Sequence, residues 1–177
     1  YLPDWISLND EFIDIDPSNE NLYKGDKVPL DKLKNKSYDE IIKEYKYDFD
    51  FSPLVGKYLI ITGSGKYFKN CKAKPSENLG IVKVIDSNTL GLLWGFADGG
   101  VPTSEAPTHL KSHIERLKVD ENHRLVIHCH PTNIICMTHI HSLDSNSFTL
   151  DLWRMQTESI VVFPEGVGVL PWMLCGG

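Results

Sequence analysis

Three apolar runs in the first half of the chain have the length and the flanking residues of β-strands. Residues 57–61 are aliphatic and lead into a loop rich in glycine, residues 62–66. Two further runs, 80–85 and 90–94, are joined by residues 86–89, whose Asp, Ser, Asn and Thr side chains favour turns. Short apolar runs bounded by turn residues are typical of strands. We therefore expect a strand followed by a β-hairpin.

Helical spacing of apolar residues begins after residue 102. Three large aliphatic residues recur at intervals of three and four, which places them on one face of a helix. They are Leu110, Ile114 and Leu117. Thr103 and Ser104 precede them and offer side-chain oxygens that can cap a helix, while Pro107 suits a first helical turn. This segment is therefore expected to be a helix.

Two other segments show helical spacing, and two more show strand character. A short amphipathic helix is predicted between residues 38 and 45, where the spaced residues are Tyr38, Ile41, Ile42 and Tyr45. Residues 133–141 are also expected to be helical, with the start near Thr132. Residues 125–128 and 159–163 predict short apolar strands, and the second is followed by a turn at 164–166. Hairpin strands with interleaved helices favour the α/β class, with a partly antiparallel sheet and helices on both faces.

The composition excludes several classes of function. The chain has 177 residues, 41% hydrophobic and 24% charged, which is typical of one globular domain. A formal charge of −6 has the wrong sign for broad attraction to a nucleic-acid backbone, although a local basic patch could serve a small phosphorylated ligand. Membrane insertion is disfavoured, because Pro164, Glu165 and Pro171 interrupt the most apolar stretch, residues 160–173.

The four cysteines contain no C-x-x-C pair and do not suggest a disulfide framework, so a reducing cytoplasm is expected. They are Cys71, Cys129, Cys136 and Cys175. The sequence opens at Tyr1 and stops at Gly177 just after an apolar segment. We expect it to be cut at both ends.

A histidine pair, His128 and His130, stands at the end of the β-branched run V-I-H-C-H-P-T-N. In a strand, side chains two residues apart point to the same side, so both imidazoles could bind one metal ion. Two ligands do not make a zinc site, which usually needs at least three, and the alternative is a pair of ordinary histidines. His139 and His141 repeat the spacing on a predicted helix, where the side chains diverge and cannot easily share an ion.

Two segments have the chemistry of an anion site. The loop containing Ser64 has glycines like a phosphate cradle, but it lacks the spacing of a nucleotide-binding loop, so a plain tight turn is the alternative. Thr103 and Ser104 bring hydroxyls to a helix start, where the helix dipole favours anions; an ordinary helix cap is the alternative. Glu105 follows directly. A carboxylate close to a metal and a phosphoester can move a proton at a carbon beside a carbonyl.

Glu158 and the tryptophans are less informative. Glu158 precedes the run 159–163 and is either a second acid or base or a solvated carboxylate at a strand edge. Trp94, Trp153 and Trp172 are expected to pack in the core or at an interface, which is the usual role of this residue type.

Six stretches in the second two-thirds of the chain resemble the class II, zinc-dependent sugar-phosphate aldolases, and they occur in that family's order. They are I-T-G-S-G-K-Y-F at 61–68, N-L-G-I-V-K-V at 78–84, V-P-T-S-E-A-P-T-H at 101–109, H-C-H-P-T-N at 128–133, L-W-R-M-Q-T-E at 152–158 and V-V-F-P-E-G-V-G-V-L-P-W-M at 161–173. Together they cover about residues 54–173. The later four resemble the members that cleave L-rhamnulose 1-phosphate to dihydroxyacetone phosphate and L-lactaldehyde.

The resemblance implies a three-layer α/β/α fold around a mainly antiparallel central sheet, assembled as a homotetramer with active sites between subunits. It implies that His128 and His130 are two of three zinc ligands and that Glu105 is the principal catalytic carboxylate. Phosphate would be held by Ser64, Thr103 and Ser104. Glu158 falls where a second functional glutamate acts across the interface.

The chain departs from the family pattern in two places. The third zinc-binding histidine is expected downstream of the P-W-M segment, and a glycine- and asparagine-rich phosphate-binding turn is expected upstream of Tyr1. The whole of 1–177 then belongs to one incomplete aldolase domain, in which residues 1–53 match the family least and could be an insertion. Two alternatives stay open. One is another aldolase or 4-epimerase of the superfamily acting on a sugar phosphate, and the other is a non-catalytic, adducin-like interaction module.

Overall fold

The computed structural model describes residues 40–173. They form two compact units, one within Tyr1–Val126 and the other within Ile127–Cys175. The first unit contains all the strands of the described part, and the second is helical.

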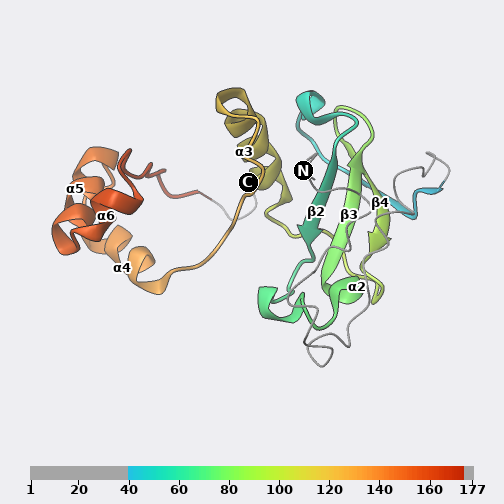
Figure 1. Ribbon diagram of the computed structural model, residues 1–177, viewed down its shortest axis with the longest axis horizontal. Coiled ribbons are helices and arrows are strands. Elements are labelled where there is room, and N and C mark those ends of the chain that lie inside the picture. The colour runs from blue at the N-terminus through green and yellow to red at the C-terminus, as the bar shows by residue number, and fades with distance from the viewer. Residues whose placement is uncertain (1–39, 174–177) are drawn as a thin grey trace, which may run out of the picture. The chain divides into compact units, whose positions relative to one another are not determined.

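A four-stranded antiparallel sheet in the order β1-β4-β3-β2 forms the centre of the first unit (Figure 1). The strands are β1 (Lys43–Lys46), β2 (Tyr58–Thr62), β3 (Leu79–Val84) and β4 (Thr89–Gly95). The strand at 57–61 and the hairpin of 80–85 with 90–94 are therefore confirmed. In the hairpin, Val82 pairs with Leu92 and a bulge lies between Ile81 and Val82. The α/β class and the antiparallel sheet are also confirmed.

The prediction of a helix between residues 38 and 45 is wrong. Lys43–Lys46 forms the edge strand β1, in which Tyr45 pairs with Leu90. Hydrogen bonds to β4 and burial of Tyr45 against the core outweigh a weak local preference for helix. Tyr38 lies outside the described residues.

Buried side chains gather on both faces of the sheet, because neighbouring residues of a strand point to opposite sides. The larger cluster consists of Phe51, Leu54, Leu59, Ile61, Val82, Val84, Leu90, Leu92, Phe96, Ala106 and Leu110. On the other face Ile81 and Leu93 are buried, with Trp94 packed against them. Burial of one such side chain contributes about 1.5–3 kcal/mol.

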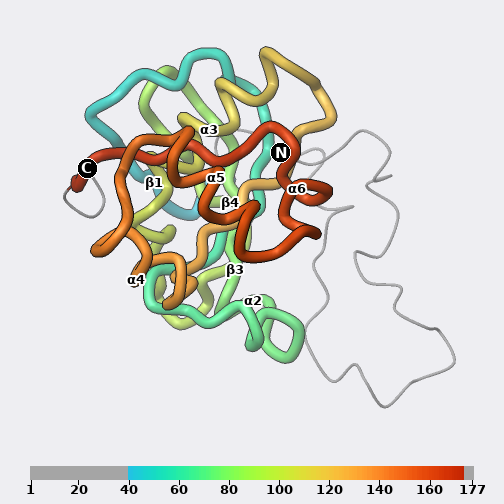
Figure 2. The backbone as a smooth tube through the Cα atoms, turned by 90° about the vertical axis from the view of Figure 1, so that its left-hand side faces the viewer, coloured from blue at the N-terminus to red at the C-terminus, as the bar shows by residue number. Residues whose placement is uncertain are grey.

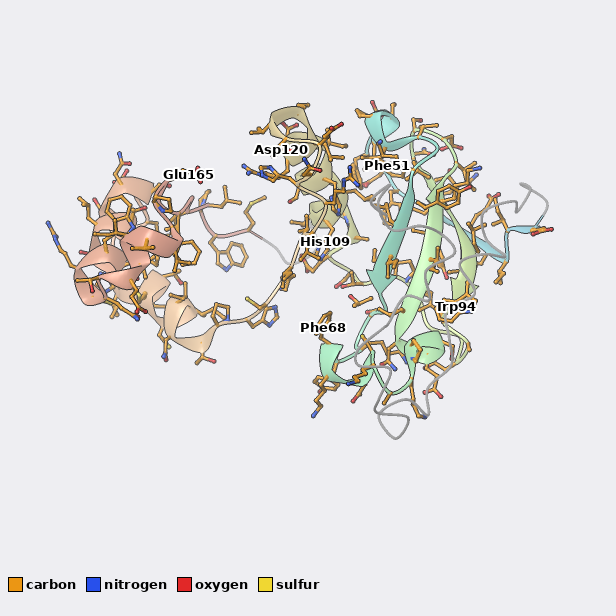
Figure 3. The ribbon with its side chains drawn as sticks, viewed as in Figure 1. Phe51, Phe68, Trp94, His109, Asp120 and Glu165 are labelled. Carbon is orange, nitrogen blue, oxygen red and sulfur yellow. The ribbon has the colours of Figure 1, made fainter. Side chains whose placement is uncertain are left out.

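Helix α3 (Ala106–Val119) covers the larger cluster through Ala106 and Leu110, so the helix predicted after residue 102 is confirmed. Pro107 lies in its first turn, as expected. Three short elements lie near the ends of the strands: η3 (Ser52–Leu54), η4 (Phe68–Asn70) and α2 (Pro75–Asn78). Helix α2 contacts β3 and β4, and Figures 1 and 2 both show it at one end of the sheet. Phe51 and Phe68 mark opposite ends of β2 in Figure 3.

The second unit consists of α4 (Thr132–Ile140), α5 (Ser145–Met155) and α6 (Glu158–Val162). Helix α4 confirms the predicted helix at 133–141 and its start at Thr132. Helix α5 is capped by Asp144, whose Oδ1 accepts a 2.9 Å hydrogen bond from the Ser147 amide. The turn at 164–166 is confirmed by a 3.0 Å hydrogen bond from the Gly166 amide to the Phe163 carbonyl oxygen.

The two strands predicted in this part of the chain are wrong. Residues 125–128 are irregular, with Leu125 and Ile127 79% and 74% exposed, and residues 159–162 belong to helix α6. An apolar run becomes a strand only when another strand offers it hydrogen bonds. Among residues 40–173 no strand pairs with either run.

Within residues 40–173, no helix combines the length and the apolar character needed to cross a membrane. Cys71, Cys129 and Cys136 are free thiols, in line with the expectation from their spacing, and Cys175 lies outside the described residues.

Candidate functional site

Two segments far apart in the sequence are joined by backbone hydrogen bonds in the first unit. The Ser64 amide donates to the Val101 carbonyl oxygen at 2.8 Å, and the Thr103 amide donates to the Thr62 carbonyl oxygen at 2.9 Å. Gly63 and Pro102 form a β-bridge between these contacts. The structure therefore brings the Ser64 loop beside the segment that carries Thr103 and Ser104, as a shared phosphate site requires.

The side chains of this loop pair suit an anionic ligand. Ser64 and Ser104 are exposed and Thr103 is half-buried, so hydroxyl groups are available at the start of α3. A helix N-terminus adds partial positive charge, which favours a phosphate. Together these features support an anion site more strongly than either segment does alone.

The expectation that Thr103 or Ser104 caps α3 is wrong. The cap residue is Glu105, which makes no capping bond with its side chain. The Thr103 hydroxyl accepts a 3.3 Å hydrogen bond from the Glu105 amide, and the Thr103 carbonyl oxygen accepts one of 3.0 Å from Ala106. This turn before the helix moves the helix start beyond the hydroxyl residues and places the half-buried Glu105 beside them.

Lys66 and Asp98 form an ion pair that also connects the two segments. Asp98 Oδ1 accepts a 3.2 Å hydrogen bond from the Gly100 amide, which holds the turn leading to residue 101. The hydrogen bond from Lys66 is the main reason that the pKa of Asp98 lies below its usual value. The Asp98 carboxylate therefore stays ionised over the whole neutral range.

A hollow of about 470 Å³ adjoins the Ser64 loop. Its lining residues are Gly65, Lys66, Tyr67, Asn70, Ala73, Lys74, Glu77 and Asn78. Lys74 lies 3.0 Å from Glu77 across this lining, so both lysines of the hollow have a carboxylate partner. The two lysines of the hollow are therefore balanced by two carboxylates.

The face of α3 that begins with Glu105 continues with His109 and His113, at intervals of four. His109 lies on the helix in Figure 3, and its amide donates a 3.0 Å hydrogen bond to the Glu105 carbonyl oxygen. His113 is buried, and its Nδ1 atom has no hydrogen-bond partner. Burial lowers the pKa of His113 to about 4, so the imidazole is neutral at pH 7.

His128 and His130 lie in the second unit on the irregular segment before α4. Their ring centroids are 4.8 Å apart, so the two imidazoles are neighbours even without the predicted strand. Neutral imidazole nitrogens are good ligands for zinc and related divalent ions. The pair fits two positions of such a site. Among residues 40–173 no group of three His, Cys, Asp or Glu side chains stands ready to hold an ion.

The second histidine pair, His139 and His141, spans the end of α4. His139 is exposed on α4, whereas His141 is the residue that ends the helix, and its Nδ1 atom lies 2.7 Å from Asp151 Oδ2. His139 therefore faces solvent, whereas His141 is hydrogen-bonded to Asp151.

Glu158 is exposed in the first turn of α6, where its Oε2 accepts a 3.3 Å hydrogen bond from Gln156. Trp94 packs against the smaller cluster of the sheet, and Trp153 Nε1 donates to the Phe163 carbonyl oxygen at 3.1 Å. Trp172 is 86% exposed, so it does not pack in the core of the described residues, and its predicted role at an interface stays a prediction.

One residue near the loop pair escaped the sequence analysis. Phe96 is buried, and its backbone lies in the left-handed region with φ +49°. A bulky residue in this conformation costs of order 1–3 kcal/mol, which the surrounding contacts must offset. The sequence gives only an indirect signal of this turn, which is the group of glycines near Phe96: Gly95, Gly99 and Gly100.

Comparison with known proteins gives one family. The family described as Class II Aldolase and Adducin N-terminal domain matches residues 50–176. A rhamnulose-1-phosphate aldolase of Listeria monocytogenes serovar 1/2a is 52% identical over 138 residues, covering 77% of this chain and 50% of that protein. One of Enterococcus faecalis is 49% identical over the same length, and one of Mannheimia succiniciproducens is 45% identical over 152 residues. The chain spans about half the length of the curated relatives it matches.

A solved structure shares the fold. The crystal structure of a sugar-phosphate aldolase from Thermotoga maritima superposes with a TM-score of 0.62 at 23% sequence identity, covering 80% of this chain and 59% of the other. The family match extends over most of the chain and includes the Ser64 loop, Glu105 and the histidine pair. The resemblance to class II aldolases is thereby confirmed, and the chain belongs to the class II aldolase and adducin N-terminal domain family.

Proposed function

We propose that the whole protein containing this chain is a metal-dependent aldolase that cleaves L-rhamnulose 1-phosphate to dihydroxyacetone phosphate and L-lactaldehyde. The observation that carries the proposal is the hydrogen-bonded pairing of the Ser64 loop with the Thr103 segment beside Glu105. Relatives about half identical in sequence carry the name rhamnulose-1-phosphate aldolase, which supports the choice of substrate.

In this proposal the loop pair binds and orients the phosphate. The hydroxyls of Ser64, Thr103 and Ser104 donate hydrogen bonds to its oxygens, and the α3 dipole stabilises its charge. Fixing the phosphate places the carbonyl end of the substrate in one orientation, which lowers the entropic part of the barrier. The Glu105 carboxylate then moves a proton to or from the carbon beside the carbonyl.

His128 and His130 would hold a divalent cation, which we propose to be zinc, together with a third protein ligand. Such a cation supplies Lewis-acid stabilisation of the negative charge that develops as the carbon–carbon bond breaks. The two histidines would bind and orient the ion through their imidazole nitrogens.

The remaining features of the proposal concern the assembled protein. Both compact units would belong to one aldolase domain, because the family match at 50–176 extends over both. The whole protein would be a cytoplasmic homotetramer in which Glu158 of one subunit serves as a second acid or base in the site of another.

The experiment offers the whole protein three substrates: L-rhamnulose 1-phosphate, L-fuculose 1-phosphate and L-ribulose 5-phosphate. Release of dihydroxyacetone phosphate from the first at the highest kcat/KM supports the proposal. Faster cleavage of the second, or epimerisation of the third, would assign the protein to another branch of the superfamily. Turnover of none of the three would favour an adducin-like interaction module, the other class that the family name includes.

Glu105→Gln tests the role of the carboxylate. Removal of a general acid–base group typically costs about 10²–10⁴-fold in rate. We expect this loss in proton exchange at the carbon of dihydroxyacetone phosphate beside its carbonyl, with metal content unchanged. Glu115→Gln, on the same helix but exposed and paired with Lys118, is the matched control. Undiminished exchange in Glu105→Gln would remove Glu105 from this role.

A further inference from the structure

Phe96 has a buried side chain in an unfavourable backbone conformation. Its exposed fraction is 4%. Among residues 40–173, Phe96 is the one non-glycine residue with a positive φ, which is +49°. Bulky residues rarely adopt this region, and when they do the surrounding structure holds them there, commonly near a functional site. The contacts of Phe96 therefore indicate which part of the structure its conformation supports.

The Phe96 ring lies against three glycines from three different segments. A Cβ atom on Gly63 would lie 3.1 Å from the ring, one on Gly80 2.4 Å from it and one on Gly100 3.5 Å from it. Gly63 belongs to the Ser64 loop, Gly80 to β3, and Gly100 to the turn that leads to Thr103. The ring thus contacts both segments that carry the candidate phosphate-binding hydroxyls.

The backbone of Phe96 is fixed from both sides. Its amide donates a 3.1 Å hydrogen bond to the Leu79 carbonyl oxygen at the start of β3, and its carbonyl oxygen accepts one of 2.9 Å from Gly99. The left-handed conformation turns the chain sharply after β4 and directs the ring toward Gly63 and Gly80. A smaller side chain in the same conformation would leave the space between the glycines empty.

We propose that Phe96 is a positioning residue for the phosphate site. Its ring sets the spacing between the Ser64 loop and the Thr103–Ser104 segment, and this spacing determines how well their hydroxyls bind a phosphate monoester. The choice of phosphate as the ligand rests on the proposed function. The mechanical part, that Phe96 holds the two segments together, rests on the contacts alone.

The test of the mechanical part compares Phe96→Leu with Phe51→Leu in the full 177-residue chain. Both phenylalanines are buried in the same core cluster, but the ring contacts of Phe51 are with Tyr47 and Phe49. The amides of Ser64 and Thr103 form the hydrogen bonds between the two segments, and that of Val84 donates to Lys57 in the sheet. Hydrogen exchange at the Ser64 and Thr103 amides reports separation of the two segments, whereas exchange at the Val84 amide reports opening of the sheet.

In Phe96→Leu we expect exchange at Ser64 and Thr103 to accelerate at least about tenfold more than exchange at Val84. In Phe51→Leu all three amides should accelerate equally. Gly63→Ala introduces a Cβ atom 2.8 Å from Lys66 Cγ and 3.1 Å from the Phe96 ring. It should give the same exchange pattern as Phe96→Leu while Phe96 is retained. This variant replaces Phe96→Leu in the test if Phe96→Leu does not fold. Equal acceleration of the three amides in Phe96→Leu, or in Gly63→Ala where it replaces that variant, would overturn the proposal.

Binding of inorganic phosphate, followed by the Ser64 and Thr103 amide resonances, tests the consequence for the site. We expect affinity at least about tenfold weaker in Phe96→Leu than in the unchanged chain, with Phe51→Leu unaffected. Equal affinity in Phe96→Leu would overturn the positioning role. If the unchanged chain binds no phosphate, the result counts against the proposed function of Ser64, and the exchange measurement alone decides the role of Phe96.

Discussion

Lys66 forms an ion pair with Asp98, and this contact joins the Ser64 loop to the turn that leads to Thr103. The Lys66 side chain is 21% exposed, so its charge is partly shielded from water while it lies beside a candidate phosphate site. A bound phosphate would compete with Asp98 for this ammonium group.

Asp98→Asn should therefore strengthen the binding of inorganic phosphate. The amide can still accept the hydrogen bond from Gly100, whereas the charge that neutralises Lys66 is removed. Partly exposed ion pairs are weak, so we expect an increase in affinity of about 1.4- to fivefold. Asp86→Asn, in the hairpin turn, is the control with the same change in net charge. Weaker binding in Asp98→Asn would show that the pair supports the site and does not compete with it.

The contact of α3 with the sheet should dominate the stability of the first unit. Leu110 is 1% exposed, and its truncation to alanine leaves a cavity between α3 and the sheet. We expect Leu110→Ala to lower the free energy of unfolding by about 2–5 kcal/mol. Val119→Ala, at the exposed end of the same helix, should change it by less than about 0.5 kcal/mol. Urea unfolding measures both, and similar losses would mean that α3 is not held through Leu110.

His113 should make stability depend on pH below neutrality. Its pKa is about 4 in the folded chain and about 6.5 when unfolded, so the unfolded state binds the proton first as pH falls. The contribution of neutral His113 is complete above pH 6.5 and is lost between about pH 6.5 and 4, by about 3 kcal/mol.

His113→Leu should flatten the stability profile in this pH window, because no buried imidazole then resists protonation. The carboxylates with lowered pKa values, such as Asp98 and Asp144, affect stability only from about pH 5 downward, so the upper part of the window reports His113. Unfolding midpoints measured from pH 7 to pH 4.5 check the sign. Parallel curves for the two proteins would contradict the burial of a neutral His113.

The His141–Asp151 pair should stabilise the second unit by fastening the end of α4 to α5. Its 2.7 Å hydrogen bond is half-buried, and such a bond contributes about 0.5–1.5 kcal/mol. Asp151→Ala should lose about that amount, while Asp144→Asn, which keeps a hydrogen-bond acceptor at the α5 cap, should lose less. Proteolysis within 142–144, followed over time, reports the difference. Equal rates in the two variants would remove the pair from this role.

Sequence patterns predicted the elements whose hydrogen bonds are local or whose partner lies nearby in the chain. The hairpin 80–95 and helix α3 belong to this group, because turn residues and helical spacing determine them within a short window. The runs 125–128 and 159–163 have the same strand-like composition, but they find no strand to pair with among residues 40–173. Strand formation depends on that partner, which a local pattern does not contain.

The candidate site was predictable in its residue types and less so in its construction. Ser64, Thr103, Ser104 and Glu105 stand out by their chemistry, and the structure brings their segments together through Thr62 and Val101. Phe96 has no chemical signal, since its role depends on a left-handed backbone and on glycines that are distant in sequence. Positioning residues of this kind become visible only when the contacts are known.

The most direct test of the central claim is cleavage of L-rhamnulose 1-phosphate by the whole protein before and after divalent ions are removed completely. The account predicts that activity disappears with the metal and returns on addition of zinc. It also predicts that His128→Ala and His130→Ala are not restored at the same zinc concentration, whereas His139→Ala, an exposed histidine of α4, is restored. Undiminished cleavage in the metal-free protein, or full restoration of His128→Ala, would contradict the account.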